Sequence, residues 1–350
     1  MSLYSHRVVQ ADMDKIVSDT SVPFDKLQGK TILITGATGM LAYYMTCVCM
    51  HLNRSKSYDI HVIALVRNEQ KAKARFEEFI GNDKFELCIQ DVCQPIELHR
   101  HIDYIVHAAG AASPWFIKHD PVGIVRANTI GTMNVMECAK KSEASNVLFL
   151  STREIYGEVK GVSMIKETDM GIIDPKAPRS CYPESKRMSE QILQSYYSQY
   201  GVPYTLARIA HSYGPGMIIE NDGRVMSDFI CDTVHRRNIV LKSEGLAERA
   251  FCYITDAVTA LFIILLKGEI SRAYNVANET EPTPIKDVAQ KLVELFPEND
   301  RKVIFEIAKD TSGYCAYKRV GLDTSILESI GWSAKVKLEE GMKNTVLSFE

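Results

Sequence analysis

The chain has 350 residues, of which 46% are apolar, and 41 basic and 44 acidic residues give it a formal net charge of −3. This length suits one large domain or two domains that share a cleft. The near balance of charges disfavours a nucleic-acid binder, which would normally carry a strong basic excess. Nine scattered cysteines without a Cys-x-x-Cys pair predict reduced thiols in a cytoplasmic protein and no metal site.

Membrane attachment is not expected. The first fifteen residues, MSLYSHRVVQADMDK, are polar and lack the apolar core of a signal peptide. The longest apolar stretch, Ala257 to Leu266, is well short of the ~20 residues that cross a bilayer. We expect it to form a buried helix.

Short apolar strands alternate with helices over much of the chain after an N-terminal extension of residues 1–29. The expected strands are residues 31–35, 60–66, 85–90, 104–107, 147–151 and 204–209. The expected helices follow the first strand to about residue 52 and then cover 71–80, 128–141 and 184–200. This alternation predicts an α/β fold with a doubly wound parallel sheet. Residues 30–210 would form a cofactor-binding domain, to which 252–278 return, and 211–251 and 279–350 a smaller substrate-binding lobe.

A glycine-rich turn follows the first strand and opens a helix, in the segment TGATGMLA at 35–42. Gly36 permits the tight turn, and Gly39 lets the backbone approach a pyrophosphate. The helix N-terminus would present free N–H groups to that anion. Because a strand precedes the turn and a helix follows it, the segment predicts dinucleotide binding by Gly36, Thr38, Gly39, Met40 and Leu41 rather than an ordinary turn.

The end of the second strand carries Arg67, where an acidic residue would be expected to hold the adenosine ribose. An arginine there can pair with the 2′-phosphate of NADP, or it can simply be solvated, so NAD is expected and NADP stays open. Asp91 and Val92 follow the third strand and are candidates for the adenine edge. Ala108 and Ala109 follow the fourth strand, where small residues would let the backbone pass close to the cofactor.

Tyr182 and Lys186 are four residues apart at the start of a helix and therefore share one face. A free tyrosine has a pKa of about 10, and a nearby ammonium would lower that pKa. Thr152, just past the fifth strand, is placed to hold a substrate oxygen. Such a trio can take the proton of a sugar hydroxyl while hydride leaves the same carbon for a nicotinamide. The pair alone also fits a solvated helix surface, and the order of the three motifs favours catalysis.

With these motifs the chain resembles the extended short-chain dehydrogenase/reductase family of nucleotide-sugar epimerases, dehydratases and decarboxylases. The resemblance covers roughly residues 28–348. It rests on TGATGMLA at 35–42, DV at 91–92, HAAGAASP at 107–114, NTIGTMN at 128–134, STREIYG at 151–157, YPESK at 182–186, RIAHSYGPG at 208–216, RAFCYITD at 249–256 and LDTSILESIGW at 322–332. The segments ASP at 112–114, NDGRVMSDFI at 221–230 and KR at 318–319 make it most similar to UDP-glucuronate decarboxylases.

This resemblance implies a Rossmann-type fold, a nucleotide-diphosphate sugar as substrate, and a homodimer formed through the helices at about 128–141 and 184–200. It implies that Thr152, Tyr182 and Lys186 oxidise the sugar at C4, and that Glu154 and Arg319 act in the second step. The substrate-binding residues that it implies are Ser113, Pro114, Arg153, His211, Arg224, Val225 and Arg249.

Three departures from the family pattern bear on the reaction. Arg153 stands where decarboxylases usually have Ser and 4,6-dehydratases Asp, and an arginine cannot donate a proton at neutral pH. Dehydration is therefore disfavoured. His211 replaces an Asn of the segment that contacts the diphosphate, and Lys242-Ser243 replaces a Tyr-Gly near the base, so the nucleobase stays open.

Decarboxylation of a nucleotide-linked uronate is the expected reaction. A 4-epimerase is the alternative, followed by a 4,6-dehydratase, because one fold serves all three. A protein of another class, a catalytically silent nucleotide sensor, would be expected to have lost Tyr182 or Lys186, and both are present.

Overall fold

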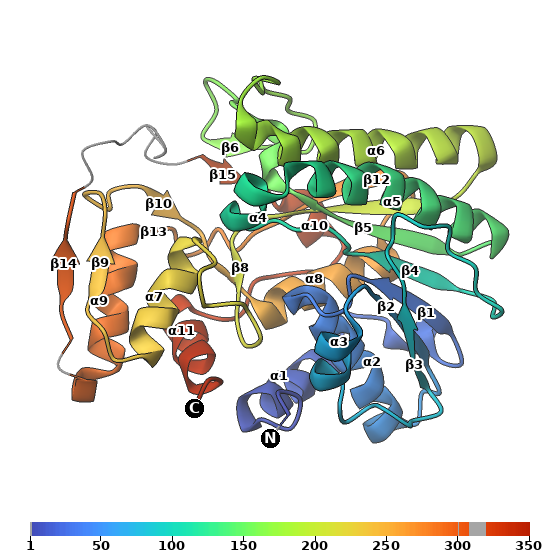
Figure 1. Ribbon diagram of the computed structural model, residues 1–350, viewed down its shortest axis with the longest axis horizontal. Coiled ribbons are helices and arrows are strands. Elements are labelled where there is room, and N and C mark those ends of the chain that lie inside the picture. The colour runs from blue at the N-terminus through green and yellow to red at the C-terminus, as the bar shows by residue number, and fades with distance from the viewer. Residues whose placement is uncertain (1, 300, 308–319) are drawn as a thin grey trace.

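A seven-stranded parallel sheet forms the centre of the computed structural model, which describes residues 2–299, 301–307 and 320–350 (Figure 1). The strand order is β3-β2-β1-β4-β5-β7-β12. These strands are β1 (Thr31–Thr35), β2 (His61–Val66), β3 (Phe85–Ile89), β4 (Tyr104–His107), β5 (Asn146–Thr152), β7 (Tyr204–Ile209) and β12 (Arg272–Val276). The order reverses between β1 and β4, where a doubly wound sheet binds its ligand.

Helices cover both faces of this sheet, which confirms the expected fold class (Figure 1). One face packs against α5 (Pro121–Lys141) and α6 (Cys181–Tyr200). The other packs against α2 (Met40–Lys56) and α8 (Ile254–Lys267), which are covered in turn by α1 (Arg7–Val17). The apolar stretch expected to be a buried helix lies within α8, which is buried from Ile254 to Leu266. Within the described residues, no helix is long and apolar enough to cross a membrane.

The third helix is shorter than the sequence predicts. A helix was expected over residues 71–80, but α3 covers Glu69–Arg75. Asn68 begins it by accepting a hydrogen bond from the Lys71 backbone N–H at 2.8 Å. After Phe76 the chain turns, and the rings of Phe76 and Phe79 lie 5.1 and 5.6 Å from that of Phe85. Burial of this aromatic cluster outweighs the helix-forming tendency of the charged segment.

The N-terminal segment belongs to the main hydrophobic core. Val9, Met13 and Ile16 on one side of α1 are buried against α2 and α8. The buried Asp12 carboxylate accepts hydrogen bonds from the hydroxyls of Tyr44 and Tyr253, each at 2.9 Å. This segment therefore ties the first helix of the sheet domain to the start of α8.

A smaller lobe lies to one side of the sheet (Figure 1). Its helices are α7 (Val225–Val234), α9 (Ile285–Leu295) and α11 (Leu338–Leu347). Its strands pair as β9 (Ile239–Leu241) with β14 (Val303–Phe305), and β10 (Glu248–Arg249) with β13 (Thr283–Pro284). The remaining short elements are α4 (Pro114–His119), α10 (Ser325–Ser329), β6 (Met164–Ile165), β8 (Ser212–Tyr213), β11 (Cys252–Tyr253) and β15 (Gly321–Leu322).

Candidate active site

The glycine turn after β1 is packed against the end of β4. Gly36 has φ +62°, and a Cβ added there would lie 2.7 Å from the Ala109 Cα and 2.8 Å from the Ala108 carbonyl oxygen. Only glycine fits this left-handed, closely approached position. Gly39 is the N-cap of α2 and supplies no side-chain cap, so the first N–H groups of a 17-residue helix keep their capacity for an anion.

The other residues expected at this turn, Thr38, Met40 and Leu41, are partly exposed around the start of α2. The turn therefore has both features that a pyrophosphate needs, a close backbone and an uncapped helix N-terminus. These features fit the dinucleotide that the sequence predicts.

A buried histidine that the sequence analysis did not single out supports this turn. His107 Nδ1 hydrogen-bonds with Thr35 Oγ1 at 2.8 Å, and His107 Nε2 with Thr132 Oγ1 at 3.1 Å. The Ala109 N–H donates to the same Thr35 oxygen at 3.2 Å. Burial lowers the pKa of His107 to about 3, so the ring is neutral. It holds β1, β4 and α5 together beneath the glycine turn.

Arg67 lies at the rim of this region. Its Nη1 is 3.9 Å from Asp91 Oδ2, and its side chain is 72% exposed. Asp91 also accepts from the Cys93 N–H at 2.8 Å, and Val92 is buried. The Asp91 carboxylate thus partly neutralises the charge of Arg67, for which the sequence had suggested no partner within the protein.

Thr152 and Tyr182 come together at the end of β5 and the first turn of α6. A hydrogen bond from Thr152 lowers the pKa of the phenol, but burial and the charge of Glu154 raise it, and the net value is about 12. Burial is the largest of these effects. The expected lowering of this pKa by Lys186 is therefore not found: the pKa is raised, and the groups that lower it are Thr152, Arg224 and Arg179.

Lys186 lies inside the protein one turn further along α6. Its Nζ donates to the Leu150 carbonyl oxygen at 2.7 Å and lies 4.4 Å from the centre of the Phe149 ring. Burial lowers its pKa to about 7. Because Tyr182 and Lys186 are both buried, the alternative that they form a solvated surface pair is wrong.

Asn128 is a site residue to which the sequence analysis gave no role. Its Nδ2 donates to Ser185 Oγ at 2.8 Å, while its buried Oδ1 has no partner among the described residues. A Cβ added to Gly110 would lie 2.7 Å from that oxygen and 3.6 Å from Lys186 Nζ. An unpaired buried acceptor beside an ammonium is a place for a water molecule or a ligand hydroxyl. The sequence did contain an indication of Asn128, because the NTIGTMN segment at 128–134 is one of those that resemble the family.

Glu154, which follows Thr152 by two residues, is paired with a residue that the sequence analysis missed. Arg179 Nη2 donates to Glu154 Oε1 at 2.7 Å. Both charges act on Tyr182, because the carboxylate raises the pKa of the phenol and Arg179 lowers it. No segment of the sequence predicted this pairing.

Arg224 is also near Tyr182, whose pKa its charge lowers. Its guanidinium binds both carboxylate oxygens of the buried Asp222, with Nη2 to Oδ2 at 3.0 Å. It is the N-cap residue of α7, followed by the exposed Val225. A Cβ added to Gly223 would lie 3.6 Å from Pro114, so this loop meets α4.

Ser113, the residue before Pro114, is the N-cap of α4. Its Oγ accepts from the Phe116 N–H at 3.5 Å. The expected substrate residues at the start of α4 and of α7 therefore lie on two adjoining loops.

Arg153, His211 and Arg249 line one small cavity on the lobe side of the sheet. Arg153 Nη1 lies 3.2 Å from His211 Nε2, and its Nη2 donates to the Val320 carbonyl oxygen at 3.3 Å. Burial and the two arginines lower the pKa of His211 to about 3, so the neutral ring accepts from Arg153. His211 has φ +48°, a left-handed conformation that Asn and His tolerate better than most residues.

Residues 32–277 match the family described as NAD dependent epimerase/dehydratase. The chain belongs to this family. It is 32% identical over 322 residues to UDP-glucuronic acid decarboxylase 6 of Arabidopsis thaliana, covering 89% of this chain and 86% of the relative.

Two solved structures show the epimerase/dehydratase fold at lower identity. UDP-glucose 4-epimerase of Thermotoga maritima, with UDP-glucose, has a TM-score of 0.77 at 23% identity and covers 91% of this chain and 98% of its own. UDP-glucuronic acid 4-epimerase of Bacillus cereus, in complex with UDP-glucuronic acid and NAD, has a TM-score of 0.75 at 20% identity, with coverage of 91% and 98%.

The expected residues of this epimerase/dehydratase site gather in two groups. Thr152, Glu154, Tyr182 and Arg224 interact around the start of α6, while Arg153, His211 and Arg249 line the neighbouring cavity. Arg319 lies outside the described residues, so its role stays a prediction.

Proposed function

We propose that this protein oxidises the C4 hydroxyl of a nucleotide-linked sugar, and that its substrate is a uronate which then loses CO2, as in a UDP-glucuronate decarboxylase. The observation that carries the proposal is the burial of Tyr182 and Lys186 in the first turns of α6, where Lys186 Nζ donates to the carbonyl oxygen of Leu150 on β5, the strand that ends at Thr152. The family is NAD-dependent, and the uncapped glycine turn fits that cofactor. Bound NAD+ would supply the acceptor for the hydride.

Each member of the trio has a distinct task in this proposal. Thr152 holds the C4 oxygen, and the Tyr182 phenolate takes the proton of the C4 hydroxyl. The Lys186 ammonium stabilises the phenolate, because an opposite charge nearby favours the ionised form. Oxidation at C4 thus requires that the negatively charged oxygen of Tyr182 and the positively charged nitrogen of Lys186 lie on the same face of α6.

Decarboxylation follows from the chemistry of the oxidised sugar. A ketone at C4 makes a uronate a β-keto acid, in which the C5–C6 bond breaks and its electron pair moves toward the C4 oxygen. Carbon dioxide leaves, and C5 takes up a proton. We assign the guiding of that proton to Glu154, a carboxylate whose charge acts on Tyr182, and the relative named as a decarboxylase supports this reaction. The C4 ketone would then regain a hydride from the reduced cofactor and a proton from the Tyr182 hydroxyl, so that the net reaction is loss of CO2 alone.

A 4-epimerase is the alternative, and the Glu154–Arg179 ion pair is the observation that favours it. The pair must open before the carboxylate can reach C5. Epimerisation at C4 needs the oxidising trio and rotation of the sugar, and it needs no proton transfer by Glu154. A 4,6-dehydratase is third, because Arg153 cannot act as an acid at neutral pH.

A panel of nucleotide sugars distinguishes these reactions. Incubation with UDP-glucuronate should release CO2 and give a product that is lighter by the mass of CO2. If UDP-glucuronate gives no CO2 while a hexose nucleotide is epimerised, the decarboxylase proposal is wrong. If every nucleotide sugar binds and none is converted, the protein is a silent nucleotide sensor.

Tyr182→Phe tests the trio itself. The variant should lose turnover while it keeps NAD binding, since the ring remains and only the hydroxyl is removed. Thr152→Ser, which keeps a hydroxyl, is the matched control and should stay active. Full activity in Tyr182→Phe would remove the basis of the proposal.

We also propose that α5 and α6 face a second copy of the chain. Apolar side chains stand exposed along these helices, namely Val122, Val125, Ile130, Met133, Met188, Tyr197 and Tyr200. A homodimer would bury them. Light scattering should report twice the mass of one chain. The Met133→Lys variant should have a lower measured mass, closer to that of the monomer.

A further inference from the structure

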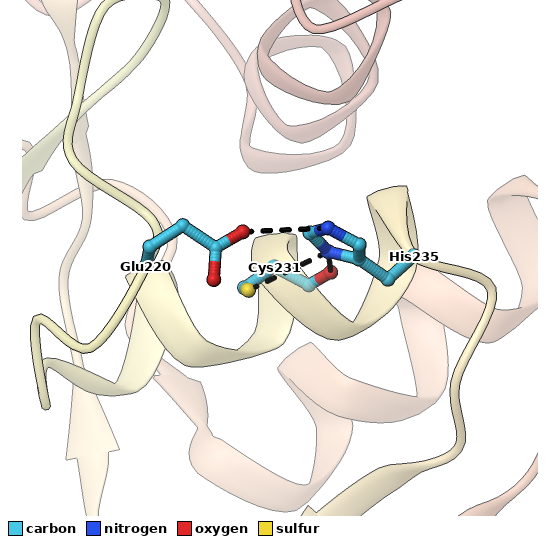
Figure 2. Close-up of side chains that lie close together, drawn as sticks. All are labelled: Glu220, Cys231 and His235. Carbon is cyan, nitrogen blue, oxygen red and sulfur yellow. Dashed lines mark hydrogen bonds and ion pairs between the residues drawn. The ribbon is translucent and has the colours of Figure 1, made fainter.

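Three side chains of metal-ligand type meet near the end of α7 that is remote from Arg224 (Figure 2). They are Glu220, Cys231 and His235, and one ligand atom from each lies within 4.8 Å of the others. Cys231 and His235 are four residues apart and share a helix face, whereas Glu220 comes from the loop before α7. The sequence analysis found no metal site, because the third residue reaches the pair only through the fold of that loop.

The histidine is oriented as metal-binding histidines are. His235 Nδ1 lies 2.9 Å from the Cys231 carbonyl oxygen, so a proton on Nδ1 is donated to that carbonyl. The lone pair of Nε2 then faces Glu220 Oε1 at 3.3 Å. Two acceptors cannot bond each other, so this contact needs either a second proton on the ring, which makes an ion pair, or a metal cation between the two atoms. Tetrahedral ligands about 2.0–2.1 Å from Zn²⁺ are themselves roughly 3.3 Å apart.

The cysteine adds a sulfur ligand to this pair. The largely buried Cys231 Sγ lies 3.7 Å from His235 Nδ1. Arg237 Nη2 donates to the sulfur at 3.3 Å, and Arg237 also pairs with Asp232 at 3.0 Å. Burial and the Glu220 carboxylate raise the pKa of the Cys231 thiol, and the guanidinium offsets part of that rise, so the thiol would lose its proton only as a metal binds. A thiolate, an imidazole and a carboxylate suit Zn²⁺ rather than Mg²⁺ or Ca²⁺.

We propose that Glu220, Cys231 and His235 bind one Zn²⁺ ion. The side chains of His235 and Glu220 are 44% and 60% exposed, so the ion can enter and a water molecule can fill the fourth position. On binding, the Cys231 thiol releases its proton to solvent as the Zn–S bond forms. The ion fastens the loop before α7 to the helix, and its role is structural.

Cobalt substitution tests this site directly. The purified chain, treated with a chelator and then titrated with Co²⁺, should bind one equivalent and show the charge-transfer absorption of a cobalt–thiolate bond. Cys231→Ser should abolish that absorption and weaken binding by about 100-fold or more, since even outer-shell partners of a metal change affinity 10–100-fold. Cys88→Ser, which removes a partly exposed thiol on β3, is the control and should leave the absorption unchanged.

A second measurement covers the chance that Cys231→Ser folds poorly. Zn²⁺ should raise the Tm of the unaltered chain and not that of Glu220→Gln or His235→Gln, both of which change exposed side chains. The proposal is wrong if Co²⁺ binds without the thiolate absorption. It is also wrong if Zn²⁺ raises the Tm of the Glu220 and His235 variants as much as that of the unaltered chain. In that case Glu220 and His235 form only an ion pair beside the Cys231 thiol.

Discussion

Arg179 donates a hydrogen bond to Glu154 at 2.7 Å, and these two residues shift the pKa of Tyr182 in opposite directions. The Glu154 carboxylate disfavours the phenolate, and the Arg179 guanidinium favours it. The pair therefore adjusts how readily the proposed base accepts a proton, on top of the larger effect of burial.

Removing either charge should move the pH profile of kcat/KM. Since the phenolate is the active form, activity rises with pH through the pKa of Tyr182. Glu154→Gln lowers that pKa and should shift the acid limb to lower pH, whereas Arg179→Gln should shift it to higher pH. Under the decarboxylase proposal, Glu154→Gln should also lower kcat by about 100-fold. Shifts in the same direction for both variants would contradict this account.

The two glycines of the phosphate turn should differ in their tolerance of a side chain. Gly36→Ala adds a Cβ at positive φ against the Ala109 backbone and should lower the free energy of unfolding by about 2 kcal/mol or more. Gly39→Ala has φ −70° and meets only the Gly36 carbonyl oxygen at 3.3 Å, so its cost should be about 1 kcal/mol or less. Urea unfolding of the two variants makes the comparison, and equal losses would show that close packing of the turn does not matter.

Arg67 is the residue that we expect to contact the 2′-phosphate if the chain binds NADP. If Arg67 contacts the 2′-phosphate, Arg67→Ala should weaken the binding of NADP by about 10–100-fold, as expected for the loss of a charge-assisted hydrogen bond. The binding of NAD should change much less. Calorimetric titration with both cofactors measures this. Lys73→Ala, which removes a charge paired with Glu69 on α3, is the control. An equal effect of Arg67→Ala on the binding of both cofactors would show that Arg67 does not contact the 2′-phosphate and only pairs with Asp91.

The buried Asp12 should make stability depend on pH in a defined window. Burial raises its pKa from 3.8 to about 7, so the folded chain binds more protons there than the unfolded chain between about pH 4 and 7. Its stabilising contribution is present below pH 4 and is lost as pH rises through 7. Asp12→Asn cannot ionise and should gain stability relative to the unaltered chain over that window, by at most on the order of 4 kcal/mol.

The comparison of the two chains isolates Asp12 from other titrating groups. His107 and His211 have pKa values lowered to about 3, and they make stability rise with pH. These contributions are the same in both chains and cancel in the difference. A difference in Tm that stays constant from pH 4 to 7 would contradict the assignment.

The sequence by itself determined six of the seven strands of the sheet and the glycine turn, and it predicted the trio of Thr152, Tyr182 and Lys186. The strand β12 was not expected. β1, β4 and β7 have the expected bounds, because short apolar runs between turns leave little choice of structure. Thr152, Tyr182 and Lys186 were found because each follows directly from a strand end or a helix spacing, which are local properties.

Only the tertiary structure decided which distant side chains meet. Arg179 on Glu154, Asn128 near Lys186 and Glu220 beside Cys231 each join segments whose own residue patterns predict no contact. The N-terminal extension likewise reads as mixed in polarity, and its place in the core depends on Tyr44 and Tyr253 satisfying Asp12. Burial and partners shift the pKa of a polar group, and both exist only once the chain has folded.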